Sequence, residues 1–121
     1  MIKYIMMGKD YEWYKVANNI SELGLNNEGL IDVMVNNKQI CLAYFKNNLF
    51  SFSAVCPHAG GKLSCGYFDN EGNIVCPLHG YKFNLQNGRN VTGEGYNLKI
   101  FPVKILANAV FVGIEKNKLE I

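Results

Sequence analysis

The sequence predicts an all-β fold, and three observations support that prediction. Short runs of β-branched and aromatic residues recur along the 121-residue chain. Pairs of asparagines and clusters that contain glycine separate these runs. A helical turn is expected only at Ile20–Leu23, with Asn19 or Ser21 as its cap. Many short strands at such intervals are typical of a β-sandwich or barrel.

Each expected strand is a run of this kind, bounded by turn residues. The strands are Tyr11–Ala17, Leu30–Val35, Gln39–Phe45, Leu49–Ala54, Ile74–Cys76, Tyr81–Leu85, Leu98–Ile105 and Val110–Ile114. The turns are Asn36-Asn37, Asn47-Asn48, Asp69–Asn73, Gln86–Gly88 and Ala107-Asn108. Asparagine suits such positions because it tolerates the left-handed region and can hydrogen-bond its own backbone.

The composition is that of one globular domain, which we expect to span residues 1–121: 49% of the residues are hydrophobic and 18% are charged. The net charge is +2, and the absence of a basic run argues against a nucleic-acid partner. Ile5–Met7 is too short for a signal-peptide core, and no segment reaches the roughly 18 apolar residues of a membrane span. We therefore expect a cytoplasmic protein without a membrane partner, whose four cysteines are metal ligands or free thiols.

The chemistry is concentrated in two short motifs. The chain has only two histidines, and each lies within three residues of a cysteine, in Cys56-Pro57-His58 and Cys76-Pro77-Leu78-His79. Residues 59–75 separate the motifs, so the full pattern is C-x-H-x17-C-x-x-H. The hairpin signal at Asp69–Asn73 can bring both motifs to one end of a sheet. Two thiolates and two imidazoles would then converge on one point.

Two kinds of metal site use this ligand set. A tetrahedral zinc ion accepts two Cys and two His, and a [2Fe-2S] centre can have two His in place of two Cys on one iron. Zinc fingers usually pair Cys with Cys and His with His. Here each motif supplies one of each, which suits a binuclear cluster because each loop then reaches both irons. A structural zinc module remains the alternative.

The two motifs and their surroundings resemble those of Rieske iron–sulfur proteins, in particular the ferredoxin components of aromatic-ring-hydroxylating oxygenases. The segments that carry the resemblance are Cys56–Ser64, Cys76–Phe83 and Asn87-Gly88-Arg89, within a match from Trp13 to about Gly113. The resemblance implies a Rieske-type antiparallel β-sandwich with a small cluster-binding subdomain at about residues 55–84. It also implies one [2Fe-2S] cluster per chain, with Cys56 and Cys76 on the inner iron and His58 and His79 on the outer iron.

The resemblance also implies a function. The expected protein is a one-electron carrier that passes electrons from a flavin-dependent or other reductase to a terminal oxygenase, with both partners docking transiently near His58 and His79. Only 16 residues follow Ile105, too few for the mononuclear-iron domain of an oxygenase, so we expect no catalytic residues. The small subunit of a nitrite reductase is an alternative within the same family.

The chain departs from the respiratory branch of the family at several positions. Gly61 and Leu78 stand where that branch has a pair of bridging cysteines, so that disulfide cannot form. Tyr81 and Phe83 replace a serine and a tyrosine whose hydroxyls raise the reduction potential in that branch. A third loop contains Gly93-Glu94-Gly95 in place of the Gly-Pro of many relatives, which leaves the shielding of the cluster open.

The remaining candidate residues have simpler interpretations. Cys41 lies on one strand face with Ala43 and Phe45, and we expect it to pack in the core. Cys65 lies outside both motifs and is expected to be a loop thiol. Lys62, Lys82 and Glu94 are expected to be ordinary solvated charges.

Overall fold

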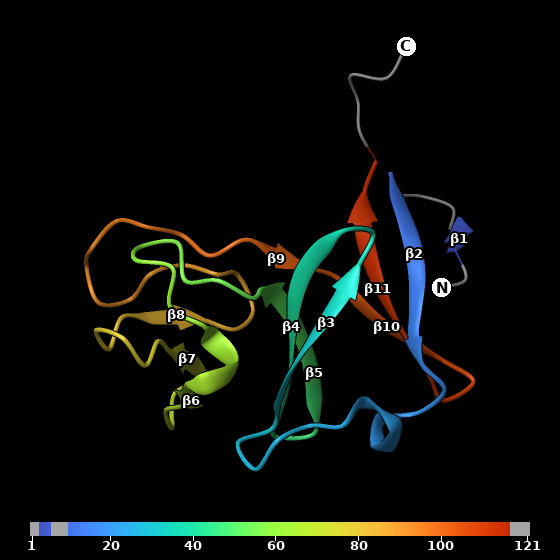
Figure 1. Cartoon of the computed structure of the whole chain (residues 1–121), viewed down its shortest axis with the longest axis horizontal. Coiled ribbons are helices and arrows are strands. Elements are labelled where there is room, and N and C mark those ends of the chain that lie inside the picture. The colour runs from blue at the N-terminus through green and yellow to red at the C-terminus, as the bar shows by residue number, and fades with distance from the viewer. Residues whose placement is uncertain (1–2, 6–9, 117–121) are drawn as a thin grey trace.

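The computed structural model describes residues 3–5 and 10–116 and contains three antiparallel sheets (Figure 1). The first sheet has the order β1-β2-β11-β10, the second β3-β4-β5-β9 and the third β6-β7-β8. The strands are β1 (Lys3–Ile5), β2 (Tyr11–Ala17), β3 (Leu30–Val35), β4 (Lys38–Phe45), β5 (Asn48–Ser53), β6 (Tyr67–Phe68), β7 (Asn73–Val75), β8 (Lys82–Asn84), β9 (Ile100–Phe101), β10 (Val103–Leu106) and β11 (Ala109–Glu115). Two short 3-10 helices, η1 (Ile20–Leu23) and η2 (Leu63–Cys65), complete the elements. No helix in these residues is long and apolar enough to cross a membrane.

The first two sheets form a base, and β4 contributes to the apolar core on each of its faces. Ile40 and Leu42 are fully buried in a cluster with Tyr14 and Val112, from the first sheet. The alternate residues of β4 point to the opposite face, as the period of a strand requires. There Cys41 is fully buried in a second core, which also holds the side chains of the third sheet. The first sheet and the third sheet are therefore packed against opposite faces of β4.

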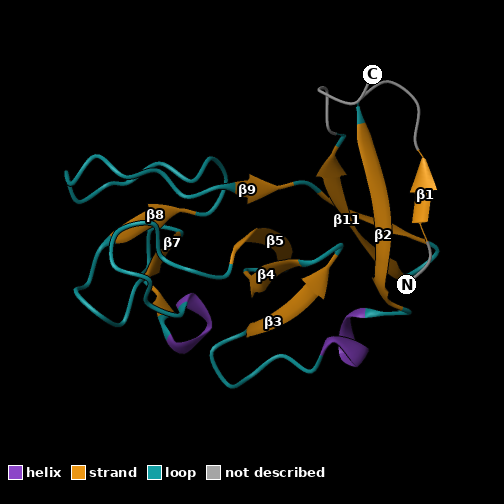
Figure 2. Cartoon of the chain, turned by 45° about the horizontal axis from the view of Figure 1, so that its top comes forward, coloured by secondary structure: helices purple, strands orange, loops and turns teal. Residues whose placement is uncertain are grey.

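The residues between β5 and β9, 54–99, form a head that contains the third sheet. Strands β5 and β9 are antiparallel neighbours, with Phe52 opposite Ile100 and the Ser53 amide donating to the Lys99 carbonyl at 2.9 Å. The head is thus an insertion between two adjacent strands of the base. Figure 2 shows that it consists mostly of loops, which the short strands β7 and β8 hold together. Ile74 and Phe83 are fully buried in its core.

The predicted helical turn and most predicted turns agree with the structure, but the turn expected at Asn47-Asn48 lies one residue earlier, at Lys46-Asn47, and Asn48 begins β5. Asn36, Asn37, Asn47 and Asn108 all have positive φ, which asparagine tolerates better than most residues. Helix η1 begins at the predicted place, and of the two proposed caps it is Asn19 that accepts a hydrogen bond from the Glu22 amide, at 3.0 Å. Gly24 ends η1 in the left-handed conformation.

The prediction of one strand over Leu98–Ile105 is wrong. Pro102 interrupts it, because proline has no amide hydrogen to donate to a sheet. The chain pairs with β5 as β9 before Pro102 and with β11 as β10 after it. One run of apolar residues therefore passes from the second sheet to the first.

Candidate metal centre

The first ligand loop, residues 56–61, is a tight turn that closes on its cysteine. The Cys56 amide donates to the Gly61 carbonyl at 2.8 Å, and the Gly60 amide donates to the Cys56 carbonyl at 3.1 Å. Gly60 has a φ of 76°, which a glycine adopts without steric cost. These bonds bring the backbone around the cysteine and leave the His58 side chain at the outer end of the loop.

The second ligand loop, residues 76–81, repeats the same design. The Cys76 amide donates to the Tyr81 carbonyl at 2.8 Å, and the Gly80 amide donates to the Cys76 carbonyl at 3.0 Å. Gly80 also has a φ of 76°. Strands β6 and β7 lie between the loops, and β8 follows the second loop, so the third sheet sets the loops relative to each other.

The four predicted ligand residues lie in two layers. Cys56 and Cys76 are each 2% exposed and belong to the core of the head. Burial raises the pKa of the Cys56 thiol, and the neighbouring Cys76 side chain contributes to the rise. The rings of His58 and His79 lie further out, with their centroids 5.3 Å apart at 70°. His58 is half-buried and His79 is exposed.

The space beside the cysteines excludes any side chain at Gly61. A Cβ atom there would lie 2.8 Å from Sγ of Cys76 and 3.2 Å from Cβ of Leu78. Gly61 and Leu78 are the two positions that carry bridging cysteines in the respiratory branch, and the structure places them against each other. Glycine at this position keeps the space next to a predicted ligand sulfur open.

Two tyrosines cover His58. The Tyr81 hydroxyl lies 3.2 Å from Nε2 of His58, and the two rings have their centroids 4.2 Å apart. The Tyr96 ring lies on the same histidine, with a centroid distance of 5.3 Å. A histidine that ligates a metal through one ring nitrogen commonly has a hydrogen-bond partner on the other. With Nε2 engaged by Tyr81, Nδ1 is the nitrogen of His58 that is available to a metal.

The third loop, residues 90–96, lies beside the first ligand loop. Tyr96 places this loop against His58. Asn90 organises the loop, since its Oδ1 accepts from the amides of Glu94 at 2.6 Å and Gly95 at 3.0 Å. The pattern Asn-x-Thr-Gly-x-Gly is a turn signal, and sequence reasoning noted its glycines without deriving this network.

The three charged residues expected to be solvated also have polar partners, although the Lys62 side chain is 64% exposed and the Lys82 side chain 37% exposed. Lys62 pairs with Asp32 at 3.5 Å, and Lys82 pairs with Asp69 at 3.3 Å. Oε1 of Glu94 accepts hydrogen bonds from Thr92 and Asn90 within the third loop. Each of these contacts connects the loops of the head to a neighbouring segment or closes a loop on itself.

The other two cysteines lie where sequence analysis expected them. Cys41 is fully buried in β4, and burial raises the pKa of its thiol, with a further contribution from Asp32. Cys65 is exposed in η2, outside both ligand loops.

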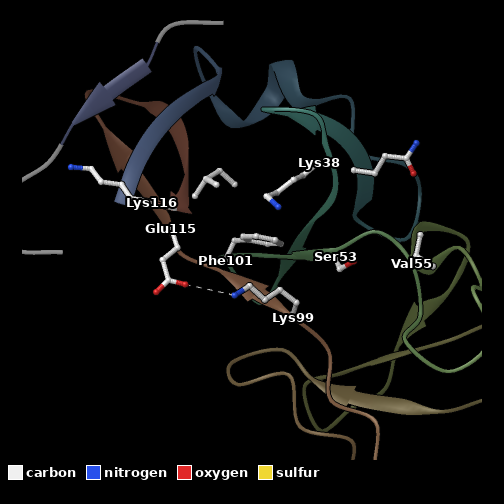
Figure 3. Close-up of a pocket in the computed structure, with 9 residues that line it drawn as sticks. Lys38, Ser53, Val55, Lys99, Phe101, Glu115 and Lys116 are labelled. Carbon is white, nitrogen blue, oxygen red and sulfur yellow. Dashed lines mark ion pairs between the residues drawn. The ribbon is translucent and has the colours of Figure 1, made fainter. Parts of the chain in front are cut away.

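A cavity of about 620 Å³ lies where the base joins the head, and none of the four predicted ligands lines it (Figure 3). Lys38, Lys99 and Lys116 contribute to its lining together with the Phe101 ring. Glu115 partly balances this charge, with Oε1 3.9 Å from Nζ of Lys99. The candidate centre is therefore the pair of ligand loops and not this cavity.

The donor set of the two loops, two sulfurs and two imidazoles, is the set that a [2Fe-2S] cluster with two His ligands takes. In the described residues, no group of three or more His, Cys, Asp or Glu side chains is arranged around one point. A cluster of this kind takes two protein ligands on each iron, which a pair of sulfurs and a pair of imidazoles in separate layers can supply. The metal also supplies the charge that a buried thiolate pair requires.

Comparison with known families identifies the class. The model of the Rieske [2Fe-2S] domain matches residues 12–102. The chain therefore belongs to the Rieske [2Fe-2S] domain family, whose cofactor is a Rieske-type [2Fe-2S] cluster.

The individual relatives compared with this chain share 16–25% sequence identity with it. The chain is 25% identical over 89 residues to the ferredoxin component of the alkene monooxygenase system of Xanthobacter autotrophicus, a match that covers 73% of each chain. It superposes with a TM-score of 0.72 and 25% identity on a chain from the complex of reduced oxygenase and oxidised ferredoxin in carbazole 1,9a-dioxygenase, covering 87% of this chain and 95% of that one. A protein described as an NADH-dependent nitrite reductase small subunit of Mycobacterium tuberculosis gives a TM-score of 0.77 at 16% identity, covering 88% of this chain and 98% of that one, which shows a shared fold.

Proposed function

We propose that the protein is a Rieske-type ferredoxin that carries one electron at a time between a reductase and a terminal oxygenase. The proposed ligands are Cys56 and Cys76 on the inner iron and His58 and His79 on the outer iron. The main observation in favour is the pair of matched loops, which hold two buried sulfurs beneath two imidazoles 5.3 Å apart. The bound cluster supplies reversible one-electron chemistry, and the chain contributes no catalytic residue of its own.

The proposed docking surface surrounds the outer histidines. His79 is exposed, and the adjacent Leu78 is 53% exposed. An apolar side chain beside a redox ligand suits a small, transient interface, as is usual for electron-transfer partners. The alkene monooxygenase relative is a ferredoxin component, and the carbazole dioxygenase structure contains an oxygenase with its ferredoxin. By analogy, the partners of this chain are a terminal oxygenase and a reductase, flavin-dependent or other.

The proposal extends to the organisation and the location of the chain. We treat residues 1–121 as a single Rieske domain with its cluster-binding subdomain at about 55–84. Cys41 and Cys65 are free thiols rather than a disulfide, as is common in the cytoplasm, where we propose that the protein acts.

Metal and sulfide analysis of the full chain tests the proposal. We expect two irons and two acid-labile sulfides per chain, a red-brown colour and a single reversible one-electron reduction. Replacing Cys76 with serine should abolish the colour, whereas the matched change Cys65→Ser should preserve it. One zinc and no sulfide in anaerobically prepared protein would overturn the assignment in favour of the zinc module.

A second assay separates the ferredoxin from the nitrite reductase subunit, which the shared fold with the Mycobacterium protein favours as the alternative. A ferredoxin should be reduced by a reductase and reoxidised by a terminal oxygenase, in a complex that dissociates during gel filtration. A stable complex with a nitrite reductase catalytic subunit, together with no electron transfer to an oxygenase, would favour the alternative.

A further inference from the structure

The third loop is fastened to the strand that follows the second ligand loop. Lys82, at the start of β8, is the anchor: its carbonyl accepts from the Val91 amide at 2.9 Å and from Nδ2 of Asn90 at 3.2 Å. The Lys82 amide in turn donates to Oγ1 of Thr92 at 3.2 Å. At its other end the loop places Tyr96 against His58. The loop therefore has a defined position beside the outer pair of ligands.

This position makes Glu94 a charge that is held near His58. Oε1 of Glu94 accepts from Nδ2 of Asn90 at 2.9 Å and from Oγ1 of Thr92, while the Glu94 amide donates to Oδ1 of Asn90. The hydrogen bond from Thr92 is the main reason that the pKa of Glu94 lies below its ordinary value, so the carboxylate is ionised at neutral pH. Its charge acts on His58 and also on Tyr81, whose pKa is raised by burial and by Glu94.

In the part of the chain that the structure describes, Glu94 has no cationic partner. Within residues 3–5 and 10–116, no lysine or arginine forms an ion pair with Glu94. Lys82 lies on the strand to which the loop is fastened, but its Nζ is 3.3 Å from Oδ2 of Asp69. The Glu94 carboxylate thus interacts electrostatically with His58, and no lysine or arginine in the described residues forms an ion pair with it.

We propose that Glu94 lowers the reduction potential of the centre by holding a fixed negative charge beside His58. The proposal rests on the proposed function, because it requires the cluster to be bound. The oxidised cluster with its two thiolates has no net charge, and it accepts one electron from the donor to reach a charge of −1. A nearby carboxylate repels that added charge and disfavours the reduced state. Glu94 contacts neither iron nor substrate, so it acts through the electrostatic environment of a ligand.

The test compares the midpoint potential of the holoprotein with that of Glu94→Gln, which keeps the shape of the side chain and removes its charge. We expect a higher potential, equivalent to about a threefold or larger increase in the ratio of reduced to oxidised protein at a fixed potential. A threefold change corresponds to a rise in midpoint potential of about 28 mV, because a tenfold change corresponds to 59 mV for one electron. Glu28→Gln removes an equal charge from an exposed turn before β3 and should leave the potential unchanged. Raising the ionic strength should reduce the difference between Glu94→Gln and wild type.

Two further variants separate charge from loop structure. Thr92→Val removes the hydrogen bonds that Oγ1 makes with Glu94, with Nδ2 of Asn90 and with the Lys82 amide, and it keeps the carboxylate. Its potential should therefore stay near that of wild type. An equal rise in Thr92→Val and Glu94→Gln would assign the effect to loop position and overturn the proposal. So would an unchanged potential in Glu94→Gln with full iron and sulfide content.

Failure to assemble the cluster is also informative. If Glu94→Gln does not retain its iron, Glu94→Ala is the second neutral variant, with the same expected rise. Loss of iron in both, with retention in Glu94→Asp, would mean that the carboxylate serves assembly and would overturn the proposal. Absence of iron and sulfide in the wild-type chain would instead refute the proposed function, and this inference with it.

Discussion

Gly61 shows how a single missing side chain can permit a metal centre. Its α-carbon faces Sγ of Cys76, and a Cβ would approach that sulfur to 2.8 Å. We predict that Gly61→Ala loses most of its iron and sulfide, because the sulfur must move to accommodate the methyl group. Visible absorbance and metal content measure the loss.

Gly60→Ala is the matched control for this prediction. A Cβ at Gly60 meets nothing closer than Cγ1 of Val55 at 4.0 Å. The left-handed φ of 76° should reduce stability by about 1 kcal/mol while the cluster remains. Equal loss of iron in both variants would show that loop conformation, and not the space beside Cys76, determines cluster binding.

The two cysteines outside the ligand loops are predicted to be dispensable. Cys41 is surrounded by the core and Cys65 is exposed in η2, so neither thiol lies in a ligand loop. The double variant Cys41→Ala, Cys65→Ser should retain its visible spectrum. Its free energy of unfolding should fall by about 1 kcal/mol, mainly from the small cavity at Cys41. Loss of the spectrum with an intact circular dichroism signal would contradict the ligand assignment.

At the scale of elements, the turn between β6 and β7 depends on one carboxylate. Oδ1 of Asp69 accepts from the amides of Glu71 and Asn73, at 2.9 and 3.0 Å. Oδ2 of Asp69 accepts from Nδ2 of Asn73 at 2.9 Å and pairs with Lys82. Partial burial raises the pKa of Asp69, but the hydrogen bonds from Asn73 and Glu71 and the Lys82 charge outweigh it and lower the value to about 2.

We predict that Asp69→Asn reduces the free energy of unfolding by about 1.5–3 kcal/mol at pH 7, the range for hydrogen bonds to a charged group. The pKa is lower in the folded than in the unfolded chain, so the stabilisation is fully present above about pH 4. It is lost as the pH falls through about 2. Urea denaturation from pH 7 downwards measures both effects, with the neighbouring Glu71→Gln as control. A difference between wild type and Asp69→Asn that does not shrink in acid would contradict the charge argument.

Elements differed in how well the sequence predicted them, for identifiable reasons. The strands Tyr11–Ala17 and Leu30–Val35 have clear patterns and clear ends, and the structure reproduces both sets of bounds. The two-residue strand β6 is too short to show alternation, and it exists because Tyr67 and Phe68 pair with β7. The break at Pro102 was readable in principle, since proline disfavours a continuous strand.

The candidate site likewise has parts that a local pattern predicts and parts that depend on long-range contacts. The two cysteines and two histidines were recognisable because their spacing is local. The contact between Tyr96 and His58, and the pairing of Lys82 with Asp69, connect residues that are distant in the sequence. The first contact depends on how the third loop returns to β8, and the second depends on the pairing of β6, β7 and β8. No local pattern determines either arrangement.

At the scale of the whole molecule, the surroundings of the centre predict a low reduction potential. Phe83 is fully buried and has no hydroxyl to donate, and the Tyr81 hydroxyl lies against His58. The backbone amides of His58 and Ala59 donate to the Cys56 sulfur, but neither Phe83 nor Tyr81 adds a hydroxyl donor. Because hydroxyl hydrogen bonds to sulfur stabilise the more negative reduced state, the lack of these two donors should leave the potential near the lower end of the Rieske range of about −150 to +300 mV. Protein-film voltammetry at neutral pH measures it. A potential well above zero would place the chain with the respiratory branch.

The insertion of the head between β5 and β9 has a consequence for how such proteins can diversify. Strands β5 and β9 pair as the two strands of a hairpin do, but the electron-carrying head takes the place of the turn between them. The head is therefore attached at two neighbouring positions of the sandwich. A graft therefore has to match only one pair of adjacent backbone ends and the apolar face of β4. Selection can change the potential and the partner surface within the inserted module, while the sandwich beneath it continues to fold as before.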